Sequence, residues 1–381
     1  AIAESGDIKY TSIQNALNSR QESGTVKVLC STTEDVAVTI EKIITLDFDN
    51  KEVIGVVRNA GILDVYNGKM KNELSTVGHS IENYGGTVTV YSGTYKGYYQ
   101  GIYQPKIDGI SEEGKVIIKG GNFEGGYDGV CICTGYLDIQ DGHFVGVHSG
   151  AAAIDYAKGV NISGGSFYDT STIYGGIVVG SCDNVTITNG YFEGKLTSGI
   201  YISAVKNLNI LGGTFKGYHQ GAIIGGNSTT INIYGGKFYG NDVAGVFTDG
   251  CDNLYIHGGY FEGSTTSGIA IYNTKYLNVS NGIYRGYNNG IYVNDGTTAE
   301  ISNVDSKGSR FGIGGRCFNL TISSGKFESE NEECVYLYKC TGNITGGTFS
   351  GNSWGINNDN GNITITGGTI RGNTKDGLYN Q

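Results

Sequence analysis

The sequence predicts an all-β fold, a parallel β-helix in which one coil of strands and turns is repeated and stacks on copies of itself. Three observations support this prediction. A glycine recurs about every 23 residues, each repeat carries apolar segments that alternate at period two, and the repeat lacks an apolar pattern of helical spacing. Gly213, Gly236 and Gly259 mark three neighbouring copies of the pattern V-x-I-x-G-G-x-F-x-G.

The same register extends along most of the chain and gives about fourteen coils. A coil of this length cannot bury one face of its own sheet, but stacked coils pair at about 4.8 Å and enclose a shared core. Propeller blades need about 40 to 50 residues, and leucine-rich repeats need a Leu/Asn consensus that is absent. The other marker positions are Gly68, Gly93, Gly121, Gly142, Gly165, Gly190, Gly282, Gly325, Gly347 and Gly368, with a degenerate copy at Val304.

Asparagine recurs just before the first apolar residue of several copies, at Asn184, Asn207, Asn253, Asn319 and Asn362. Asn tolerates left-handed backbone, and stacked amides can hydrogen-bond to one another and to turn backbone. With this ladder the chain resembles the right-handed parallel β-helix proteins of the pectate-lyase-like superfamily, over about residues 59 to 381. That superfamily includes lyases, hydrolases, phage tailspikes, adhesins and inert stalks. The resemblance is to its non-catalytic bacterial surface members, and it implies a fold more than an activity.

Residues 1–58 do not follow the repeat and are predicted to form an N-terminal cap, with the β-helix at residues 59–381. Ile13, Ala16 and Leu17 lie on one face of a predicted helix, and Ser12 is its expected N-cap. Strands of the first coils follow. This helix would cover the open end of the core. No matching cap follows Tyr379, so we expect the C-terminal end to continue into a longer chain or to meet a partner or an oligomer.

Composition narrows the classes of partner and the location. The 381 residues carry a net charge of −10 without a cluster of Lys or Arg, which argues against nucleic acid. No apolar span approaches the roughly 20 residues that a membrane helix needs. We expect a secreted or cell-surface protein. Seven Asn-x-Ser/Thr sequons, most of them at turns where a glycan would disturb stacking, favour a bacterial or phage source.

The cysteines indicate packing more than a disulfide framework. Cys182, Cys251 and Cys317 occupy equivalent positions about three coils apart, too far to bridge, and are expected to be buried. A bond between Cys317 and Cys340, one coil apart, stays open. Cys131 and Cys133 are expected to point outward on one strand in a poor geometry for a bridge. No metal site or cofactor is predicted.

Catalytic signatures are missing. The resemblance would imply the polygalacturonase motifs or the Ca²⁺-binding Asp cluster of pectate lyases, and the sequence contains neither. No catalytic residue is therefore assigned. If the protein is an enzyme, the best acidic group is Asp242, Asp249 and Asp252, although Asp252 also fits a turn cap. Asp128 and His148 lie on adjacent coils and could touch.

Aromatic residues form three sets. Phenylalanines at one repeated position are expected to stack in the core, as at Phe215 and Phe238. Outward positions on strands hold Tyr103, Tyr201, Phe247, Tyr292 and Tyr336. The turn between the two apolar segments holds the predicted ligand-binding residues Tyr98, Tyr99, Tyr127, Tyr174, Tyr218, Tyr287 and Trp354, together with Phe311. These outward aromatics either form a binding surface or reflect the β-propensity of an exposed sheet.

Together these features predict a rigid rod for adhesion or for binding a polysaccharide or host ligand, without catalysis. The ligand would be a polysaccharide or a surface protein. The alternative is a polysaccharide lyase, glycoside hydrolase or phage-type depolymerase that acts on a glycan in a surface groove.

Overall fold

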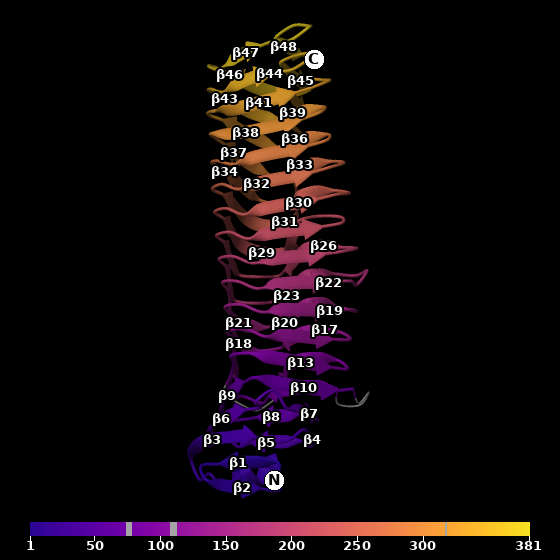
Figure 1. Ribbon diagram of the computed structural model, residues 1–381. Helices are drawn as coiled ribbons and strands as arrows, with labels where there is room; N and C mark the ends of the chain where they lie inside the picture. Colours follow the sequence, from indigo (N-terminus) through magenta and orange to yellow (C-terminus); the bar gives the residue numbers. More distant parts are fainter. Residues whose placement is uncertain (74–77, 107–112, 317) are drawn as a thin grey trace. The chain divides into compact units, whose positions relative to one another are not determined.

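The computed structural model describes residues 1–73, 78–106, 113–316 and 318–381, and it confirms the parallel β-helix (Figure 1). The described residues complete about 15 turns of strand with almost no helix. The chain divides into two compact units, Ala1–Lys195 (unit 1) and Leu196–Gln381 (unit 2).

Each coil supplies strands to three rows. Row 1 holds the F-x-G segment, row 2 the second apolar segment and row 3 the V-x-I segment. Strands of one row pair in parallel and in register, so that Phe144 lies between Phe123 and Phe167. The sequence analysis treated rows 3 and 1 as one segment. The structure divides them at the marker glycine, where Gly142 has φ +138° and Gly165 φ +96°, values that side-chain-bearing residues rarely adopt.

Unit 1 begins with two strands that pair antiparallel with their neighbours, and the three rows follow. Its row 1 strands are β4 (Thr32–Thr33), β7 (Glu52–Ile54), β10 (Gly68–Asn72), β13 (Gly93–Gly97), β16 (Asn122–Gly125), β19 (His143–Gly146), β22 (Ser166–Asp169) and β25 (Tyr191–Gly194). Its other strands are β1 (Ala3–Ser5), β2 (Ile8–Tyr10), β3 (Ser23–Val28), β5 (Val36–Val38), β6 (Ile43–Asp47), β8 (Val57–Asn59), β9 (Ile62–Tyr66), β11 (His79–Asn83), β12 (Thr87–Val90), β14 (Gln100–Gln104), β15 (Lys115–Ile118), β17 (Asp128–Ile132), β18 (Gly135–Ile139), β20 (Gly150–Asp155), β21 (Ala157–Ile162), β23 (Gly175–Gly180) and β24 (Asn184–Ile187).

Unit 2 repeats the three rows, and in two of its coils rows 2 and 3 run together as one long strand. Its row 1 strands are β28 (Thr214–Gly217), β30 (Lys237–Gly240), β32 (Tyr260–Gly263), β35 (Ile283–Gly286), β38 (Val304–Gly308), β41 (Gly325–Ser329), β44 (Thr348–Ser350) and β47 (Thr369–Arg371). Its other strands are β26 (Ser198–Ser203), β27 (Asn207–Ile210), the long strands β29 (Ala222–Ile233) and β31 (Ala244–Ile256), β33 (Ser267–Tyr272), β34 (Tyr276–Val279), β36 (Asn289–Val293), β37 (Thr298–Ile301), β39 (Phe311–Arg316), β40 (Asn319–Ile322), β42 (Val335–Tyr338), β43 (Thr341–Ile344), β45 (Ile356–Asp359), β46 (Asn362–Ile365) and β48 (Leu378–Asn380).

The core of each unit contains the predicted stack of phenylalanines. In unit 2 the ring of Phe238 is fully buried, with ring centroids 4.7 Å from Phe215 and 5.0 Å from Phe261. Tyrosine replaces phenylalanine at two of these positions, which the sequence analysis did not anticipate. The Tyr95 hydroxyl donates to the carbonyl of Ser92, and the Tyr284 hydroxyl donates to the carbonyl of Asn281 at 2.6 Å. Each buried hydroxyl therefore has a partner.

The asparagine ladder differs from its prediction. The left-handed residues are Ser181 and Ala204, three positions before Asn184 and Asn207. The Asn184 amide instead donates to the carbonyl of Lys158 at 3.3 Å. The amides of Asn184 and Asn253 thus hydrogen-bond to backbone of the preceding coil, while the tight turn lies upstream of them.

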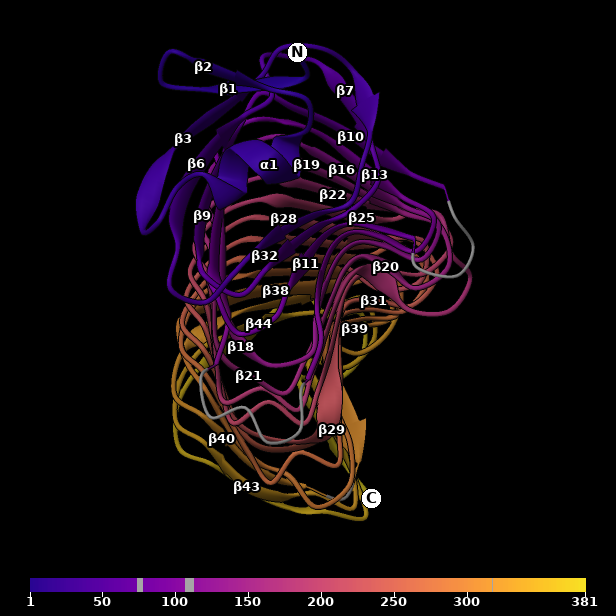
Figure 2. The same cartoon turned by 90° about the horizontal axis from the view of Figure 1, so that it is seen from below.

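The predicted N-terminal helix is present as α1 (Ile13–Asn18). Ser12 is its N-cap, and Ile13, Ala16 and Leu17 are buried, as predicted. The helix contacts β1, β2, β3 and β5 over the first coils, as Figure 2 shows from below. The boundary between residues 58 and 59 stays a prediction, and parallel pairing begins before it, between β3 and β6.

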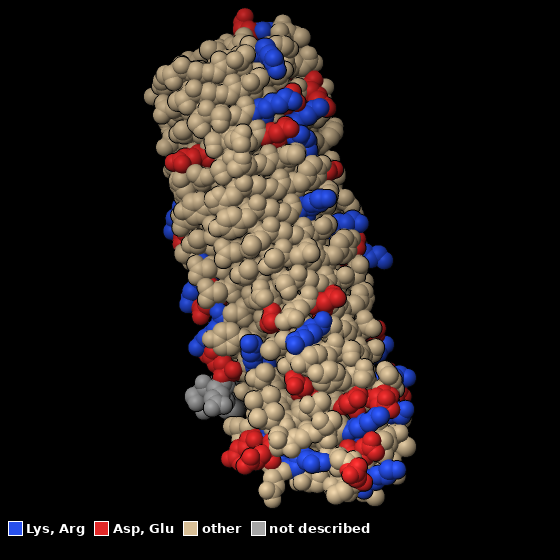
Figure 3. Space-filling model, turned by 60° about the vertical axis from the view of Figure 1, so that its left-hand side comes forward, with Lys and Arg blue, Asp and Glu red and all other residues tan. Residues whose placement is uncertain are grey.

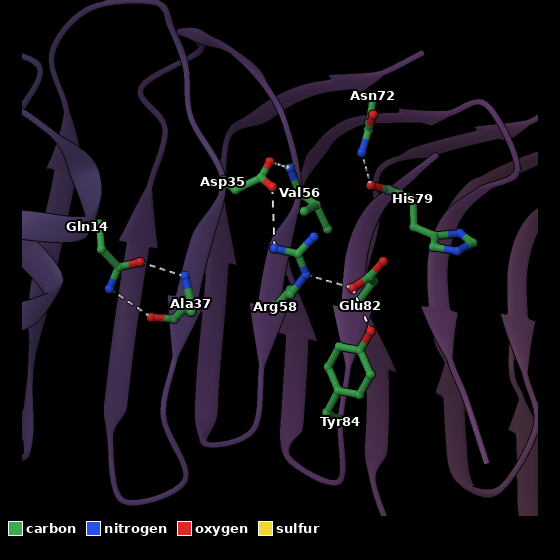
Figure 4. A network of polar contacts seen from close by, with 9 residues as sticks. All are labelled: Gln14, Asp35, Ala37, Val56, Arg58, Asn72, His79, Glu82 and Tyr84. Atoms are coloured by element: carbon green, nitrogen blue, oxygen red, sulfur yellow. Dashed lines mark hydrogen bonds and ion pairs between the residues drawn. The ribbon is translucent and has the colours of Figure 1, made fainter. Parts of the chain in front are cut away.

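A polar network joins these first coils of unit 1 (Figure 4). Gln14 of α1 accepts a hydrogen bond from the amide of Ala37 at 2.7 Å. Further along, Arg58 lies 3.3 Å from the Asp35 carboxylate and 3.1 Å from that of Glu82. Glu82 is 1% exposed, so Arg58 supplies the compensating charge that a buried carboxylate needs.

Asp128, at the start of β17, and His148 have different partners in the structure, although the sequence analysis considered a contact between them. The His148 ring lies against Tyr127, with centroids 5.3 Å apart. Asp128 is 4% exposed, and its carboxylate accepts a hydrogen bond from the Gln100 side chain at 3.1 Å. Burial raises the pKa of Asp128 to about 6.

This raised pKa predicts a pH dependence of stability. The pKa of Asp128 is higher in the folded state than in the unfolded state. Its contribution to the free energy of unfolding is therefore fully present below about pH 4 and is lost as pH rises through 6. We expect the wild type to lose on the order of 2–3 kcal/mol over that window, and Asp128→Asn to lose less. Urea denaturation at four pH values between 4 and 7 measures the difference. Identical pH profiles for the two proteins would contradict the prediction.

Candidate ligand-binding cleft

A cleft of about 580 Å³ opens in unit 2 on the outer side of β36, β39 and β42. Six side chains on its wall supply its chemistry and are called the cleft residues: Tyr292, Arg310, Phe311, Arg316, Glu333 and Tyr336. A concave site that combines aromatic faces with a few polar groups is the usual form of a small-ligand site.

One outward position in row 2 beside the cleft has no side chain. Tyr292, Gly314 and Tyr336 are neighbours in the register of three successive strands. Tyr292 and Tyr336 are therefore two strand spacings apart, roughly 9.6 Å. A Cβ atom at Gly314 would lie 2.5 Å from the Asn289 side-chain oxygen and 3.2 Å from the Phe311 ring, so these two side chains occupy the space over the glycine. They form part of the wall of the cleft, which opens beside them.

Aromatic and charged groups line this opening. The rings of Phe311 and Tyr336 are stacked, with centroids 5.2 Å apart. The Arg310 guanidinium lies over the Phe311 ring at 5.1 Å and forms two hydrogen bonds to the Glu332 carboxylate, at 2.8 and 3.1 Å. These hydrogen bonds raise the pKa of Arg310 and fix its orientation.

One carboxylate of the cleft is left for a ligand. Glu333 is 9% exposed, and within the described part of the chain it forms no hydrogen bond or ion pair. Arg316 is the second guanidinium of the wall and lies 3.5 Å from the Asp295 carboxylate. A cleft with flat ring faces, a nearly buried carboxylate and oriented guanidinium donors can stack on a sugar ring and hydrogen-bond to its hydroxyl groups.

Some of the predicted ligand-binding residues of unit 1 lie close together. The rings of Tyr98 and Tyr99 meet edge to face at 5.0 Å, and Tyr99 and Tyr127 are 5.2 Å apart. Tyr98, Tyr127 and His148 border a recess of about 380 Å³. Tyr174 is exposed in the turn between β22 and β23. The structure thus brings three of these four tyrosines into one cluster.

The predicted residues of unit 2 have separate partners. Tyr218, half exposed, meets His219 edge to face at 5.0 Å. Tyr287 is 61% exposed and borders a different recess, of about 550 Å³, beside Arg285. Trp354 stacks on Tyr379 at 4.6 Å. None of the three lines the cleft, and their role in binding stays a prediction.

The three aspartates considered for catalysis also have different partners. Asp242 pairs with His219 at 2.9 Å, Asp249 accepts a hydrogen bond from Asn273 at 2.6 Å, and Asp252 pairs with Lys275 at 2.6 Å. None of them borders the cleft. In the part of the chain that the structure describes, no group of three His, Cys, Asp or Glu residues could hold a metal ion.

The sequence analysis named the aromatic residues of the cleft but not its charged ones. Tyr292, Phe311 and Tyr336 were recognised as outward aromatics, whereas Arg310, Arg316 and Glu333 were not assigned to a site. The available signal was the pair of glycines at 314 and 315, which interrupts the Gly-Ile-Tyr-Val pattern of the neighbouring coil. On the face shown in Figure 3, Lys and Arg are interspersed with Asp and Glu between broad uncharged areas, so charge alone does not single out a site there.

Comparison with known proteins supports the architecture. Residues 170–286 match a family model described as the right handed beta helix region. No curated protein and no solved structure matched the chain. This fold fits a carbohydrate- or ligand-binding protein. Of the helical residues that the structure describes, no segment has both the length and the apolar character to cross a membrane.

Proposed function

We propose that this right-handed β-helix protein binds a polysaccharide through the cleft of unit 2, without cleaving it, and that it acts outside the cell or on the cell surface. The observation that carries the proposal is the cleft of about 580 Å³, whose wall combines aromatic rings with guanidinium and carboxylate groups. The superfamily resemblance and the expected extracellular location support the choice of a glycan over other ligands. The pectate-lyase-like assignment and the role in adhesion belong to the same proposal.

The cleft, at about 580 Å³, is large enough to admit a pyranose ring. Because the Phe311 ring covers one face of Tyr336, the sugar would stack on the aromatic surface that faces the cleft. Stacking on aromatic faces recognises the apolar side of a sugar, and Arg310, Arg316 and Glu333 offer both donors and acceptors to its edge. Neighbouring sugars of a chain would then extend out of the open cleft.

Tyr336→Ala should weaken glycan binding by about tenfold or more, because it removes a stacking face at the centre of the site. A glycan array identifies the ligand, and titration calorimetry on the wild type and the variant measures the loss. Tyr201→Ala is the matched control, since Tyr201 has an equivalent outward position on β26 but does not border the cleft. Equal losses in both variants would contradict a site at the cleft. Gly314→Tyr, whose side chain would displace Asn289 and Phe311 from the wall of the cleft, should also abolish binding.

A second candidate function is glycan cleavage in the same cleft, favoured by the nearly buried carboxylate of Glu333. A general acid in such a position contributes a factor of about 10² to 10⁴ in rate. Our proposal predicts that the wild type releases no new reducing ends or unsaturated products from any glycan it binds, and that Glu333→Gln changes affinity alone. Turnover that Glu333→Gln abolishes would establish the enzyme. Turnover abolished by Asp249→Asn would place catalysis at the acidic group of β31 instead.

A further inference from the structure

We propose that Cys131 and Cys133 of unit 1 form a thiol–disulfide exchange site that reacts with small-molecule disulfides and closes to an internal disulfide. The two residues belong to a Cys-Ile-Cys segment at the end of β17. This site is independent of the glycan cleft, which lies in unit 2.

The geometry brings the two sulfurs together. Residues two apart on a strand point to the same face, and the Sγ atoms of Cys131 and Cys133 are 3.8 Å apart. Both side chains are half-buried, whereas Ile132 between them is fully buried in the core. The sequence analysis expected a poor geometry for a bridge between them. A disulfide needs the sulfurs at about 2.05 Å, so they must approach further. Cys133 lies just beyond the end of β17, but its N–H donates to the carbonyl of Gln104 at 2.8 Å, so the approach has to come from the torsions of the two side chains.

The surroundings give the two thiols different roles. The hydrogen bond between the two thiols lowers the pKa of Cys133 and raises that of Cys131. A hydrogen bond from Tyr103, the strand neighbour of Cys131, also favours the Cys133 thiolate. The nearby carboxyl groups of Asp128 and Asp155 raise the pKa of both thiols, which disfavours the thiolate. Cys133 is thus the nucleophile and Cys131 the resolving thiol.

The other described cysteines do not offer this arrangement. Cys182 and Cys251 are almost fully buried, and burial raises the pKa of each to about 12. Cys334 and Cys340 are also buried, and burial raises the pKa of Cys334. The bond between Cys317 and Cys340 that the sequence left open involves Cys317, which lies outside the described residues. Cys30 is exposed and has no recorded sulfur neighbour among the described residues. Among the described residues, no group of three His, Cys, Asp or Glu side chains that could hold a metal ion includes Cys131 and Cys133, so exchange chemistry fits the pair better than metal binding.

The reaction balances with an external disulfide as the oxidant. The Cys133 thiolate attacks one sulfur of the small disulfide, forming a mixed disulfide and releasing one thiolate. Cys131 then loses its proton to solvent and attacks Cys133 Sγ, which releases the second small thiolate. The protein loses two protons and two electrons, and the small disulfide is reduced to two thiols.

The test uses the whole chain and oxidised glutathione. In the wild type we expect peptide mass spectrometry to show a Cys131–Cys133 disulfide, while exposed Cys30 keeps its glutathione adduct because it has no resolving partner. Cys131→Ser should trap glutathione on Cys133, at least tenfold faster than Cys133→Ser acquires it on Cys131. Circular dichroism confirms that the variants are folded.

Two results would overturn the proposal. One is a wild type in which Cys131 and Cys133 stay reduced, or keep separate adducts, while Cys30 reacts. The other is an equal rate of glutathione addition in the two serine variants, which would show that the thiols act independently. Either result leaves glycan binding by unit 2 unaffected, so it does not bear on the proposed function.

Discussion

Phe238→Ala is expected to lower the free energy of unfolding of unit 2 by about 3–5 kcal/mol. The Phe238 ring is completely buried and stacks on Phe215 and on Phe261, at 4.7 and 5.0 Å. Truncation removes both stacking contacts and leaves a cavity. The in-register strands on either side limit how far the coils can collapse into it. Urea denaturation followed by circular dichroism measures the change.

Phe238→Tyr provides the matched control, because the fold itself accepts tyrosine at this position. Tyr284 has the same position in another coil of unit 2, and its hydroxyl donates to the carbonyl three residues earlier, at Asn281. In the variant, the carbonyl of Gly235 would be the equivalent acceptor. We expect a loss below about 1.5 kcal/mol. A tyrosine variant as unstable as the alanine variant would show that this analogy between coils does not hold.

Gly263→Ala is expected to cost about 3 kcal/mol or more, since the new methyl group would overlap backbone. Gly263 ends row 1 strand β32, where the chain folds back on itself. A Cβ atom there would overlap the carbonyl oxygen of Ser267 and lie 2.9 Å from that of Val243. Backbone atoms held in paired strands cannot move aside as a flexible side chain can. Chemical denaturation of the variant gives the loss.

Gly296→Ala tests the cost of backbone strain without steric overlap. Gly296 has φ +77°, a left-handed value, but a Cβ atom there would have no heavy atom within 4 Å. We expect a cost of about 1–2 kcal/mol from the backbone conformation alone. If Gly296→Ala proved as damaging as Gly263→Ala, steric overlap would not be the reason for the glycine at 263.

The repeat, the core and the helix cap could be predicted because they depend on local patterns. Gly236 has a positive φ that favours glycine, and Phe238 points into the core from its strand. Both requirements arise within one repeat. The division of each copy into two strands at the glycine was missed. The apolar alternation changes phase by one residue at the glycine, since Leu208 and Ile210 are buried before it and Phe215 after it, and this change of phase marks the turn.

The left-handed positions and the cleft could not be predicted for a different reason. Ala204 adopts φ +54° although alanine has no local preference for it, because the stacked coils impose the turn. The cleft depends on what lies above and below Gly314 and on the direction that the Arg310 side chain takes. Both depend on residues of neighbouring coils, so the sequence of one repeat does not predict them.

The equivalence of successive coils also bears on how such a gene can change. A whole repeat lost or duplicated within unit 2, for example between Gly236 and Gly259, would leave every remaining residue beside a partner of its own kind, apart from one new junction. Recombination between neighbouring repeats is therefore expected to give viable variants of different length. A deletion of half a repeat would exchange inward and outward residues and prevent folding.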